Sequence, residues 1–474
     1  MIAPRRRSLA AAAVVLVAST AALFAAAVAA APITRQHHAV VAPVELVPQA
    51  ISIPTLASEA PPTTASCRAM SANRDACYDP AQLRVAYDLA SLYAAGIEGQ
   101  RQTIVIVDCY GSPTIGGDLA SFDKAFGLPA PPSFRILRPV GAISPFSRSG
   151  RDRVGWALET SLDVEWAHAL APKASILLVE TPTDEVEGTS GFPDIVRAEK
   201  LVVARRLGTV ISQSFAATEQ TFASFKELNG LRSAYVAAAA AKVTVLAGSG
   251  DLGATDYESD AKTIYPFRVT SWPSSDPLVT AVGGTKLDLN GHGTPLARAV
   301  AWNDTYSSSP PTPKATGGGR SIFFARPSYQ SPVASVTGAH RGVPDLAMSA
   351  ACSGLVDVYA SFPGQARTWL PMCGTSEATP LFAAIVALVD QKAGHGLGPI
   401  NRALYALRGT SSGLVAVTSG NNTVAFKNAS SGLTTVRGFQ ARASYNLATG
   451  LGTIDAARFV PALAREWELL NPKG

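Results

Sequence analysis

Ser376 is the first residue whose surroundings suggest chemistry. It lies in the segment MCGTSEATPLFAAIVALVDQ, residues 372–391. Gly374 and Thr375 predict a turn, and the apolar run after Pro380 predicts a helix that starts near the serine. A serine at the start of a helix is well placed to act as a nucleophile, but its hydroxyl needs a base to take the proton. Histidine is the usual base, and the chain has only six histidines.

A pair of acids could replace the histidine. Glu159 and Asp163 lie in WALETSLDVEWAHALAP, a segment with helical spacing. Residues at positions i and i+4 share one face of a helix, and two buried carboxyl groups there favour holding one proton between them. The alternative is an acidic helix face in water. Large apolar residues around the pair favour burial: Trp156, Leu158, Leu162 and Trp166.

Asp251 supplies a further part of a possible site. It follows the apolar strand in VLAGSGDLG and lies in a glycine-rich turn. Attack of Ser376 on a carbonyl group needs a hydrogen-bond donor for the developing oxyanion, and a protonated carboxyl group can be that donor. In this scheme Glu159 takes the proton of Ser376 and returns it to the leaving amine, while Asp163 holds Glu159 in place. Because carboxyl groups have ordinary pKa values of about 4, such an enzyme should work at acidic pH.

A histidine-dependent triad of Asp108, His292 and Ser376 is the rival arrangement, in the chain order of subtilisins. However, His292 lies in LDLNGHGTPL, which predicts a hairpin turn and not a helix start. It also follows Asp251, which is the wrong order for that fold. The other histidines lie in the N-terminal segment, on the Glu159 helix or in polar and glycine-rich segments. Since no Cys-x-x-C pattern occurs, we also expect no zinc site.

Alternating strands and helices must position these residues. Apolar strands are predicted in RQTIVIVDCYG, KASILLVE, TVISQSF and KVTVLAGSGDLG, with helical segments between them. This alternation predicts an α/β fold with a mainly parallel sheet and helices on both faces. Sites in such folds form at the carboxyl ends of the strands, where Asp108 and Asp251 lie. A single catalytic domain over residues 79–474 is the simplest organisation.

The N-terminal part of the chain differs from this domain. Residues 1–31 combine a basic start, an apolar run and small residues, which predicts a secretory signal peptide. Retention of residues 9–31 as a membrane anchor is the alternative. Residues 32–78 are predicted to be a low-complexity linker. We therefore expect a secreted monomer. The formal charge is +5, with three units from Arg5–Arg7, so nothing indicates a nucleic-acid partner.

The five cysteines fit an oxidising compartment. Cys67 and Cys77 could close a small loop. Cys352 and Cys373 could close the segment that leads into the serine turn. Cys109 would then remain as a buried thiol.

The chain resembles the sedolisin family of serine-carboxyl peptidases over residues 80–460. Four segments carry the resemblance: ETSLDVEWAHALAPKASI, VTVLAGSGDLGA, SWPSSDPLVTAVGGT and CGTSEATPLFAAIVALV. The motifs GGGRS, RGVPDLA and TGLGTID add weaker matches in the same order. The resemblance implies a subtilisin-like fold and an endopeptidase or tripeptidyl-peptidase that cuts peptides or proteins at acidic pH. It implies that Ser376 is the nucleophile, Glu159 the base, Asp163 its partner and Asp251 the oxyanion acid. An inactive binding protein on the same fold is the alternative, but all four positions are intact.

Two departures from the family pattern lead to further expectations. Family members bind calcium near the C-terminus through two aspartates, whereas Asn428 and Asn446 stand at these positions, with Arg442 nearby. Since calcium prefers charged oxygen ligands, we expect no metal cofactor. Members also carry a long N-terminal prodomain. The low-complexity residues before position 79 are too few to form one, so we expect latency to be controlled in another way.

Overall fold

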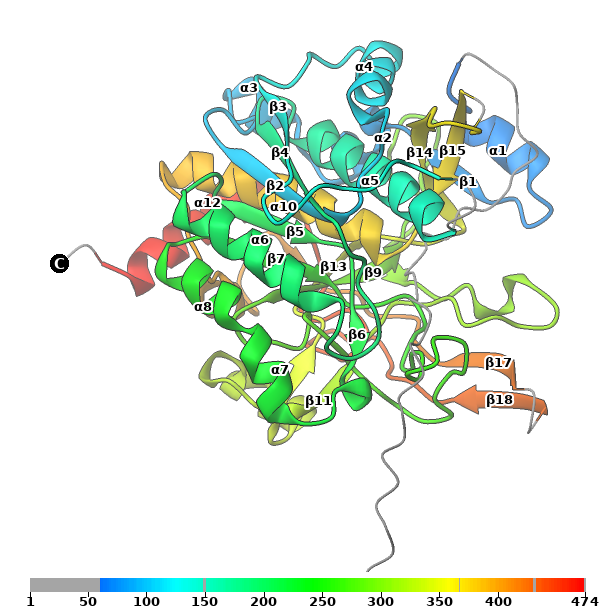
Figure 1. Ribbon diagram of the computed structural model, residues 1–474, viewed down its shortest axis with the longest axis vertical. Coiled ribbons are helices and arrows are strands. Elements are labelled where there is room, and N and C mark those ends of the chain that lie inside the picture. Colours follow the sequence, from blue (N-terminus) through cyan, green and yellow to red (C-terminus); the bar gives the residue numbers. More distant parts are fainter. Residues whose placement is uncertain (1–59, 148–150, 366, 429–431, 473–474) are drawn as a thin grey trace, which may run out of the picture. The chain divides into compact units, whose positions relative to one another are not determined.

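The computed structural model describes residues 60–472, apart from 148–150, 366 and 429–431. Within these residues, eight strands form a central sheet in the order β10, β9, β7, β5, β2, β4, β3, with β13 also paired to β9 (Figure 1). All of these pairs are parallel except β10 with β9. The mainly parallel sheet predicted from the sequence is confirmed. Its strands are β2 (Thr103–Cys109), β3 (Phe134–Leu137), β4 (Ser175–Thr181), β5 (Val210–Gln213), β7 (Thr244–Gly248), β9 (Thr280–Lys286), β10 (Val300–Ala301) and β13 (Leu346–Ser349).

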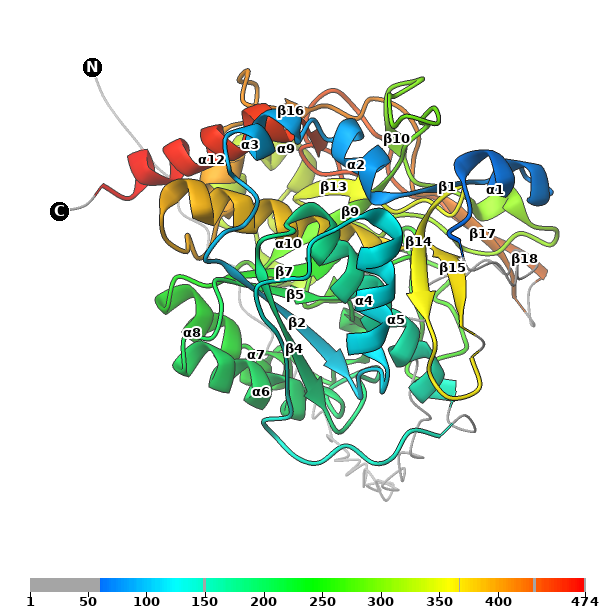
Figure 2. The same ribbon diagram turned by 90° about the horizontal axis from the view of Figure 1, so that it is seen from above.

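Helices cover both faces of this sheet. Figure 2 shows α5 and α10 on one side of it and α6 and α8 on the other. Along β2, Ile104 and Ile106 belong to the core under α5 and α10, while Val105 and Val107 belong to the core under α6 and α8. Successive side chains of a strand point to opposite faces, so a sheet covered twice needs apolar residues at every position. The helices that contact the sheet are α5 (Arg151–Leu170), α6 (Phe192–Ala204), α8 (Ser233–Ala240) and α10 (Thr375–Ala393). Three further helices pack on these: α4 (Ile115–Phe126) on α5, α7 (Phe225–Leu231) on α6 and α8, and α12 (Ala456–Leu470) on α10.

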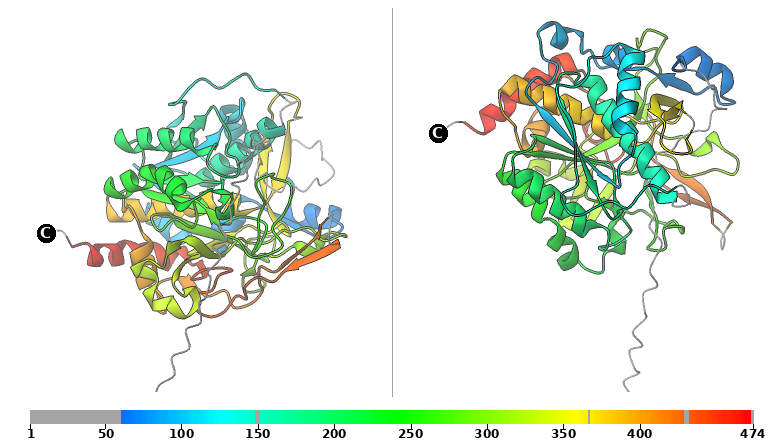
Figure 3. Two further views of the ribbon diagram at one scale, coloured as in Figure 1. Left: turned by 60° about the horizontal axis from the view of Figure 1, so that its bottom comes forward. Right: turned by 45° about the horizontal axis from the view of Figure 1, so that its top comes forward.

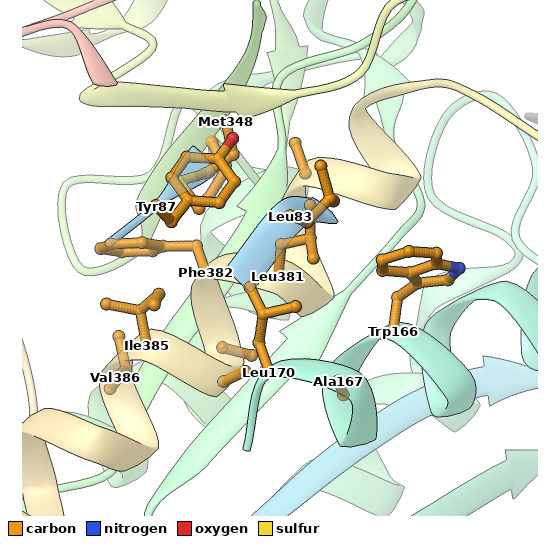
Figure 4. Packing of buried hydrophobic residues seen from close by; sticks show 14 of the residues in the cluster. Leu83, Tyr87, Trp166, Ala167, Leu170, Met348, Leu381, Phe382, Ile385 and Val386 are labelled. Atoms are coloured by element: carbon orange, nitrogen blue, oxygen red, sulfur yellow. The ribbon is translucent and has the colours of Figure 1, made fainter. Parts of the chain in front are cut away.

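Helix α5, which carries Glu159 and Asp163, packs against α10, which carries Ser376 (Figure 4). Leu170 of α5 lies close to Leu381 of α10, with Trp166 on one side of this contact and Phe382 on the other, and all four side chains are buried. Tyr87, which ends α2 (Pro80–Ala86), packs over Phe382 in the same cluster. Burying one large apolar side chain stabilises a fold by about 2 kcal/mol. This cluster therefore holds the start of α10 at a fixed position relative to α5.

The folded region begins before residue 79. Helix α1 (Thr64–Met70) and strand β1 (Ala76–Tyr78) form within the segment that the sequence assigns to a linker. Strand β1 pairs in parallel with β14 (Gly354–Ala360), which in turn pairs with β15 (Thr368–Met372). The linker prediction is therefore wrong for residues 64–78, because a disulfide and strand pairing order a segment that has no regular hydrophobic period. The predicted signal peptide and the rest of the linker lie outside the described residues.

Both predicted disulfides are present. Cys67 is bonded to Cys77, and Cys352 is bonded to Cys373. Cys109, at the end of β2, is a buried free thiol, as predicted.

Shorter elements complete the fold. The hairpin of β17 and β18 lies at its periphery in both views of Figure 3. None of the helices in the described part of the chain combines the length and the apolar character that a membrane crossing requires. The remaining elements are α3 (Ala90–Ala94), α9 (Ala334–Thr337), α11 (Asn401–Ala406), β6 (Ala217–Thr218), β8 (Ser271–Trp272), β11 (Gly319–Ala325), β12 (His340–Val343), β16 (Leu414–Val415), β17 (Val424–Asn428), β18 (Gly432–Val436), β19 (Thr453–Ile454) and the 3₁₀ turns Glu219–Thr221, Thr305–Ser307 and Ser328–Val333.

Candidate active site

Ser376 is the second residue of α10, in a turn that only glycine permits. Gly374, which precedes the helix, has a φ of 129°, a conformation that L side chains rarely adopt. A Cβ atom at Gly374 would lie 2.6 Å from Oδ2 of Asp251. The turn can therefore approach Asp251 closely only because it carries no side chain there. The disulfide of Cys373 ties the same turn to the strand region around Cys352.

The two acids of α5 lie on a buried face of the helix. Glu159 is 1% exposed and Asp163 is 0% exposed. Helix α5 packs against α10, β2 and β14, so the alternative of an acidic face in water is wrong. The packing brings the hydroxyl of Ser376 close enough to Glu159 to influence its ionisation.

Burial is the main reason why both acids favour the protonated state. It raises the pKa of Glu159 and of Asp163 well above the ordinary range. The hydroxyl of Ser376 lowers the pKa of Glu159, although neither oxygen of Glu159 has a hydrogen bond of standard geometry within the described part of the chain. Asp163 accepts a hydrogen bond at Oδ1 from the hydroxyl of Ser214, at 3.0 Å. Catalytic hydrogen bonds are often long before substrate binds.

Asp251 lies on the other side of the serine turn. Its Oδ1 accepts hydrogen bonds from the backbone N–H of Thr375, at 2.8 Å, and from the Thr375 hydroxyl, at 2.7 Å. Burial raises the pKa of Asp251 to about 6, even though these two hydrogen bonds lower it. The carboxyl group is therefore protonated in acid, with one oxygen already occupied as an acceptor.

Asp108 adds a further carboxyl group to this region. It is fully buried at the end of β2, and neither of its oxygens has a hydrogen-bond partner among the described residues. Burial raises the pKa of Asp108 to about 7. Its charge would raise the pKa of both Glu159 and Asp163. Because Asp108, Glu159 and Asp163 repel one another when charged, they do not all ionise together, and at least one of them keeps its proton.

The rival histidine triad is not assembled. His292 is exposed in a turn in which Asn290 accepts hydrogen bonds from the backbone N–H groups of His292 and Thr294. The neighbouring Gly293 lies against the backbone of Gln82. The hairpin turn predicted at this position is confirmed, and neither oxygen of Asp108 accepts a hydrogen bond from a histidine among the described residues.

Comparisons with known proteins find relatives of the chain, although no family profile matches it. Kumamolisin from Bacillus sp. (strain MN-32) is 31% identical over 395 residues, which cover 81% of this chain. The solved structure of Pseudomonas sedolisin, in complex with pseudo-iodotyrostatin, superposes with a TM-score of 0.65 at 25% identity, over 81% of this chain and 97% of that one. The chain belongs to the sedolisin family. Its subtilisin-like α/β fold is thereby also confirmed.

Further members of the sedolisin family match at lower identity. Sedolisin from Pseudomonas sp. (strain 101) is 27% identical over 80% of this chain, and tripeptidyl-peptidase 1 from Canis lupus familiaris is 28% identical over 73% of it. The aligned region spans only 63%, 60% and 58% of the length of kumamolisin, sedolisin and tripeptidyl-peptidase 1.

The residues at the position of the family's calcium site do not fit a calcium ion. Oδ1 of Asn446 accepts hydrogen bonds from the backbone N–H groups of Ala448 and Thr449, at 3.0 and 2.9 Å. This oxygen closes a local turn. The segment from 424 to 452 contains no aspartate or glutamate, so the donor set lacks the charged oxygens that calcium prefers.

The sequence does not predict the roles of three residues of the site. Ser214 donates a hydrogen bond to Asp163, Thr375 donates two to Asp251, and Asp108 is a buried acid with a raised pKa. Ser214 comes directly after β5, and Asp108 lies on the neighbouring strand β2. The position of both at carboxyl ends of adjacent parallel strands is the signal that could have found them. Their hydrogen bonds and charges depend on strand order, which the sequence pattern does not give.

Proposed function

We propose that the chain is a serine-carboxyl peptidase that hydrolyses peptide bonds at acidic pH. One observation carries the proposal: three residues from separate segments of the chain lie in one buried site, namely Glu159, Asp251 and Ser376. Family membership supports a peptidase, with endopeptidases and tripeptidyl-peptidases among the relatives.

The proposed mechanism begins with proton transfer. In the reactive form the coupled acids carry one negative charge, on Glu159, and Glu159 takes the proton of the Ser376 hydroxyl as Oγ forms a bond to the scissile carbonyl carbon. Asp163 stabilises Glu159 by sharing a proton with it. Protonated Asp251 donates a hydrogen bond to the oxygen that gains negative charge.

Collapse of the tetrahedral intermediate breaks the carbon–nitrogen bond. Glu159 gives its proton to the leaving amine, and the acyl group stays on Ser376. Water then attacks the ester carbon while Glu159 accepts a proton from it. The acyl carbon–Oγ bond breaks, Glu159 returns the proton to Oγ of Ser376, and the second product leaves with a free carboxyl group. No histidine takes part, and the base is a carboxylate within the coupled acids.

Cleavage of a mixed peptide library at pH 3 to 5 tests the proposal. We expect wild-type protein to cut, and Ser376→Ala and Glu159→Gln to lose nearly all activity. Thermal melting of each variant serves as the folding control. If Ser376→Ala retained full activity, or if the wild type bound peptides without cutting them, the peptidase assignment would be wrong. A requirement for His292, tested with His292→Ala, would instead favour the rival triad.

We further infer that the protein acts outside the cytoplasm on peptide or protein substrates. The two disulfides support this location, because disulfides persist in oxidising compartments. Detection of the protein in the culture medium, with its N-terminus determined, would test export and removal of residues 1–31.

A further inference from the structure

A small pocket lies at the carboxyl ends of three neighbouring strands. Tyr110 directly follows β2, Arg138 directly follows β3, and Glu180 is the last but one residue of β4. In the sheet these strands run parallel in the order β2, β4, β3. The pocket, called the arginine pocket below, has a volume of about 190 Å³. The lining residues that matter here are Tyr110, Gly111, Arg138, Ser144, Arg153 and Glu180. Ligands of α/β folds bind at this edge of the sheet.

The arginine pocket is open to solvent and close to the candidate active site. Ser144 and Pro145, which line it, are exposed, and the side chain of Arg138 is 53% exposed. Arg153 and Glu159 both lie on α5, and their separation in the sequence corresponds to about 9 Å along the helix axis. An extended peptide covers this length in about three residues. A substrate bound at the nucleophile can therefore reach the pocket with a residue near the bond that is cut.

Arg153 lines the pocket without forming an ion pair to any acid that the structure describes. Its guanidinium group lies over the ring of Tyr110, 3.9 Å from the ring centre. Its Nη2 donates a hydrogen bond to the backbone oxygen of Ser144, at 3.1 Å, whereas Nε and Nη1 have no hydrogen-bond partner within the described part of the chain. These contacts fix the guanidinium group and leave part of its donor fork for a ligand.

Arg138 is also held through only part of its guanidinium group. Its Nε donates to Oε2 of Glu180, at 2.6 Å, and its Nη atoms have no hydrogen-bond partner among the residues described. Glu180 is buried, and a Cβ atom at Gly111 would overlap its Oε1, so the glycine makes room for this carboxyl group. Glu180 thus orients Arg138, while the terminal nitrogens of Arg138 stay available to a second carboxylate.

Acid makes the arginine pocket more positive. Glu180 and Asp184 are the buried acids beside the two arginines, and Oδ1 of Asp184 accepts a hydrogen bond from the hydroxyl of Tyr110, at 2.9 Å. Burial raises the pKa of both acids, although their hydrogen bonds lower it. Both therefore favour the neutral form in acid, whereas guanidinium groups stay charged. Asp152, which is partly exposed, is a further acid whose charge acts on the pKa of Asp184.

We propose that the arginine pocket binds a carboxylate of the peptide substrate, with Arg138 and Arg153 as hydrogen-bond donors. The inference rests on the proposed peptidase function and names a substrate class: peptides with an acidic side chain or a free C-terminus within about three residues of the cleaved bond. The pocket volume is below the range of about 300–1,000 Å³ for drug-sized ligands and suits one side chain or chain end. Arg138 and Arg153 are thus specificity-determining residues and take no part in bond cleavage.

Matched peptides test the inference with unmodified protein. In the first set both ends are blocked, and one position carries glutamate, glutamine or lysine. That position is moved along the residues on both sides of the cleaved bond. At pH 5, where free glutamate is mostly ionised, we expect kcat/KM at one position to be about tenfold higher for glutamate than for glutamine, and lowest for lysine. The ratio of glutamate to glutamine should fall toward one at pH 3, where most of the glutamate is protonated.

A second set of peptides separates the two sources of the carboxylate. These peptides carry no acidic side chain, end at different distances after the cleaved bond, and have a free or an amidated C-terminus. A higher kcat/KM for free ends in this set alone would identify the chain end as the ligand, and a glutamate preference in the first set alone would identify a side chain. Equal rates in every pair of both sets would overturn the inference.

Variants then assign the preference to the arginine pocket. We expect Arg153→Gln to lower kcat/KM for the preferred acidic peptide by at least about threefold, and to change it by less than about twofold for the uncharged partner peptide. Arg138→Gln should act in the same direction. Arg153→Lys keeps the charge without the planar fork, so it should retain part of the preference. Arg465→Gln, at an exposed position of α12, is the control for loss of one positive charge.

The possible failures are distinguishable. If wild-type protein cut none of the peptides, the proposed function itself would fail, whereas equal cutting of acidic and uncharged peptides would overturn only the inference. An unchanged preference in folded Arg153→Gln and Arg138→Gln would overturn the assignment to the arginine pocket. If the variants did not fold, the wild-type comparison at pH 5 and pH 3 would still decide whether a carboxylate is recognised.

Discussion

Asp251 accepts two hydrogen bonds at the same oxygen from Thr375, the residue directly before the proposed nucleophile, Ser376. This arrangement leaves Oδ2 as the carboxyl oxygen that can carry the proton. Because the Cβ position of Gly374 lies 2.6 Å from Oδ2, that oxygen points at the turn that presents Ser376. The geometry therefore separates the two functions of Asp251: one oxygen fixes the turn, and the other is available to donate to an oxyanion.

Substitution of Asp251 should show that its two oxygens have separate roles. Asp251→Asn keeps an acceptor for Thr375 and supplies an amide N–H donor at every pH. We expect it to retain more activity than Asp251→Ala, which should lose roughly 10²- to 10³-fold in kcat, as for the loss of an oxyanion donor.

The pH profile gives a second measure of the same role. The wild type loses its donor as Asp251 ionises, and the pKa of Asp251 is about 6. The asparagine variant should therefore decline less steeply above about pH 6. Equal activities and equal profiles for the two variants would contradict a donor role for Asp251.

Buried acids with raised pKa values should make the fold more stable in acid than at neutral pH. Burial raises the pKa of Asp108 to about 7 and that of Asp390 to about 8. The folded state thus binds these protons more tightly than the unfolded chain. Their contribution is complete below the ordinary carboxyl pKa of about 4 and is lost as pH rises through 7 and 8. Between about pH 4 and its pKa in the folded state, each such group lowers the free energy of unfolding by about 1.4 kcal/mol for each unit that the pH rises.

Melting temperatures at pH 4 and pH 8 test this expectation. We expect a lower melting temperature at pH 8. Asp390→Asn cannot ionise, yet its oxygen can still accept the hydrogen bond from the backbone N–H of Leu397. The variant should therefore lose less stability over the same interval. A wild-type protein that is more stable at pH 8 would show that these acids do not control its stability.

The Cys352–Cys373 disulfide should matter for activity as well as for stability. It closes a separation of 21 residues and ends directly before Gly374. Cys352→Ala with Cys373→Ala should lower stability by roughly 3 kcal/mol and reduce kcat, because the serine turn loses a tether. The matched control replaces Cys67 and Cys77, which are separated by 10 residues far from Ser376 in the sequence. That control should lower the melting temperature and leave kcat unchanged. Equal effects of both pairs on kcat would contradict a role in holding the turn.

How far the site could be predicted depends on whether its signals are local. The pairing of Glu159 with Asp163 follows from helical spacing, and the position of Ser376 follows from a turn before an apolar helix. Alternating apolar strands and helices were enough to predict the parallel sheet. Each of these features is set by residues close together in the chain.

Other features depend on contacts between distant segments. Asp108 joins the acids of α5 only because β2 lies beside β4 and β5 in the sheet. The sequence around Cys67 predicts a linker because the order of this segment comes from a disulfide and from pairing of β1 with β14.

Removal of calcium should leave the protein folded and active. A cation that binds only the folded state stabilises it by mass action, so chelation lowers the melting temperature of a calcium-dependent fold. Here Asn446 uses its side-chain oxygen within its own turn, and the nearby segment carries Lys427, Arg437 and Arg442 but no acid between residues 424 and 452. We therefore expect the same melting temperature and the same kcat with EGTA and with added calcium. A fall in melting temperature that calcium restores and magnesium does not would show that backbone and amide oxygens alone suffice to hold the ion.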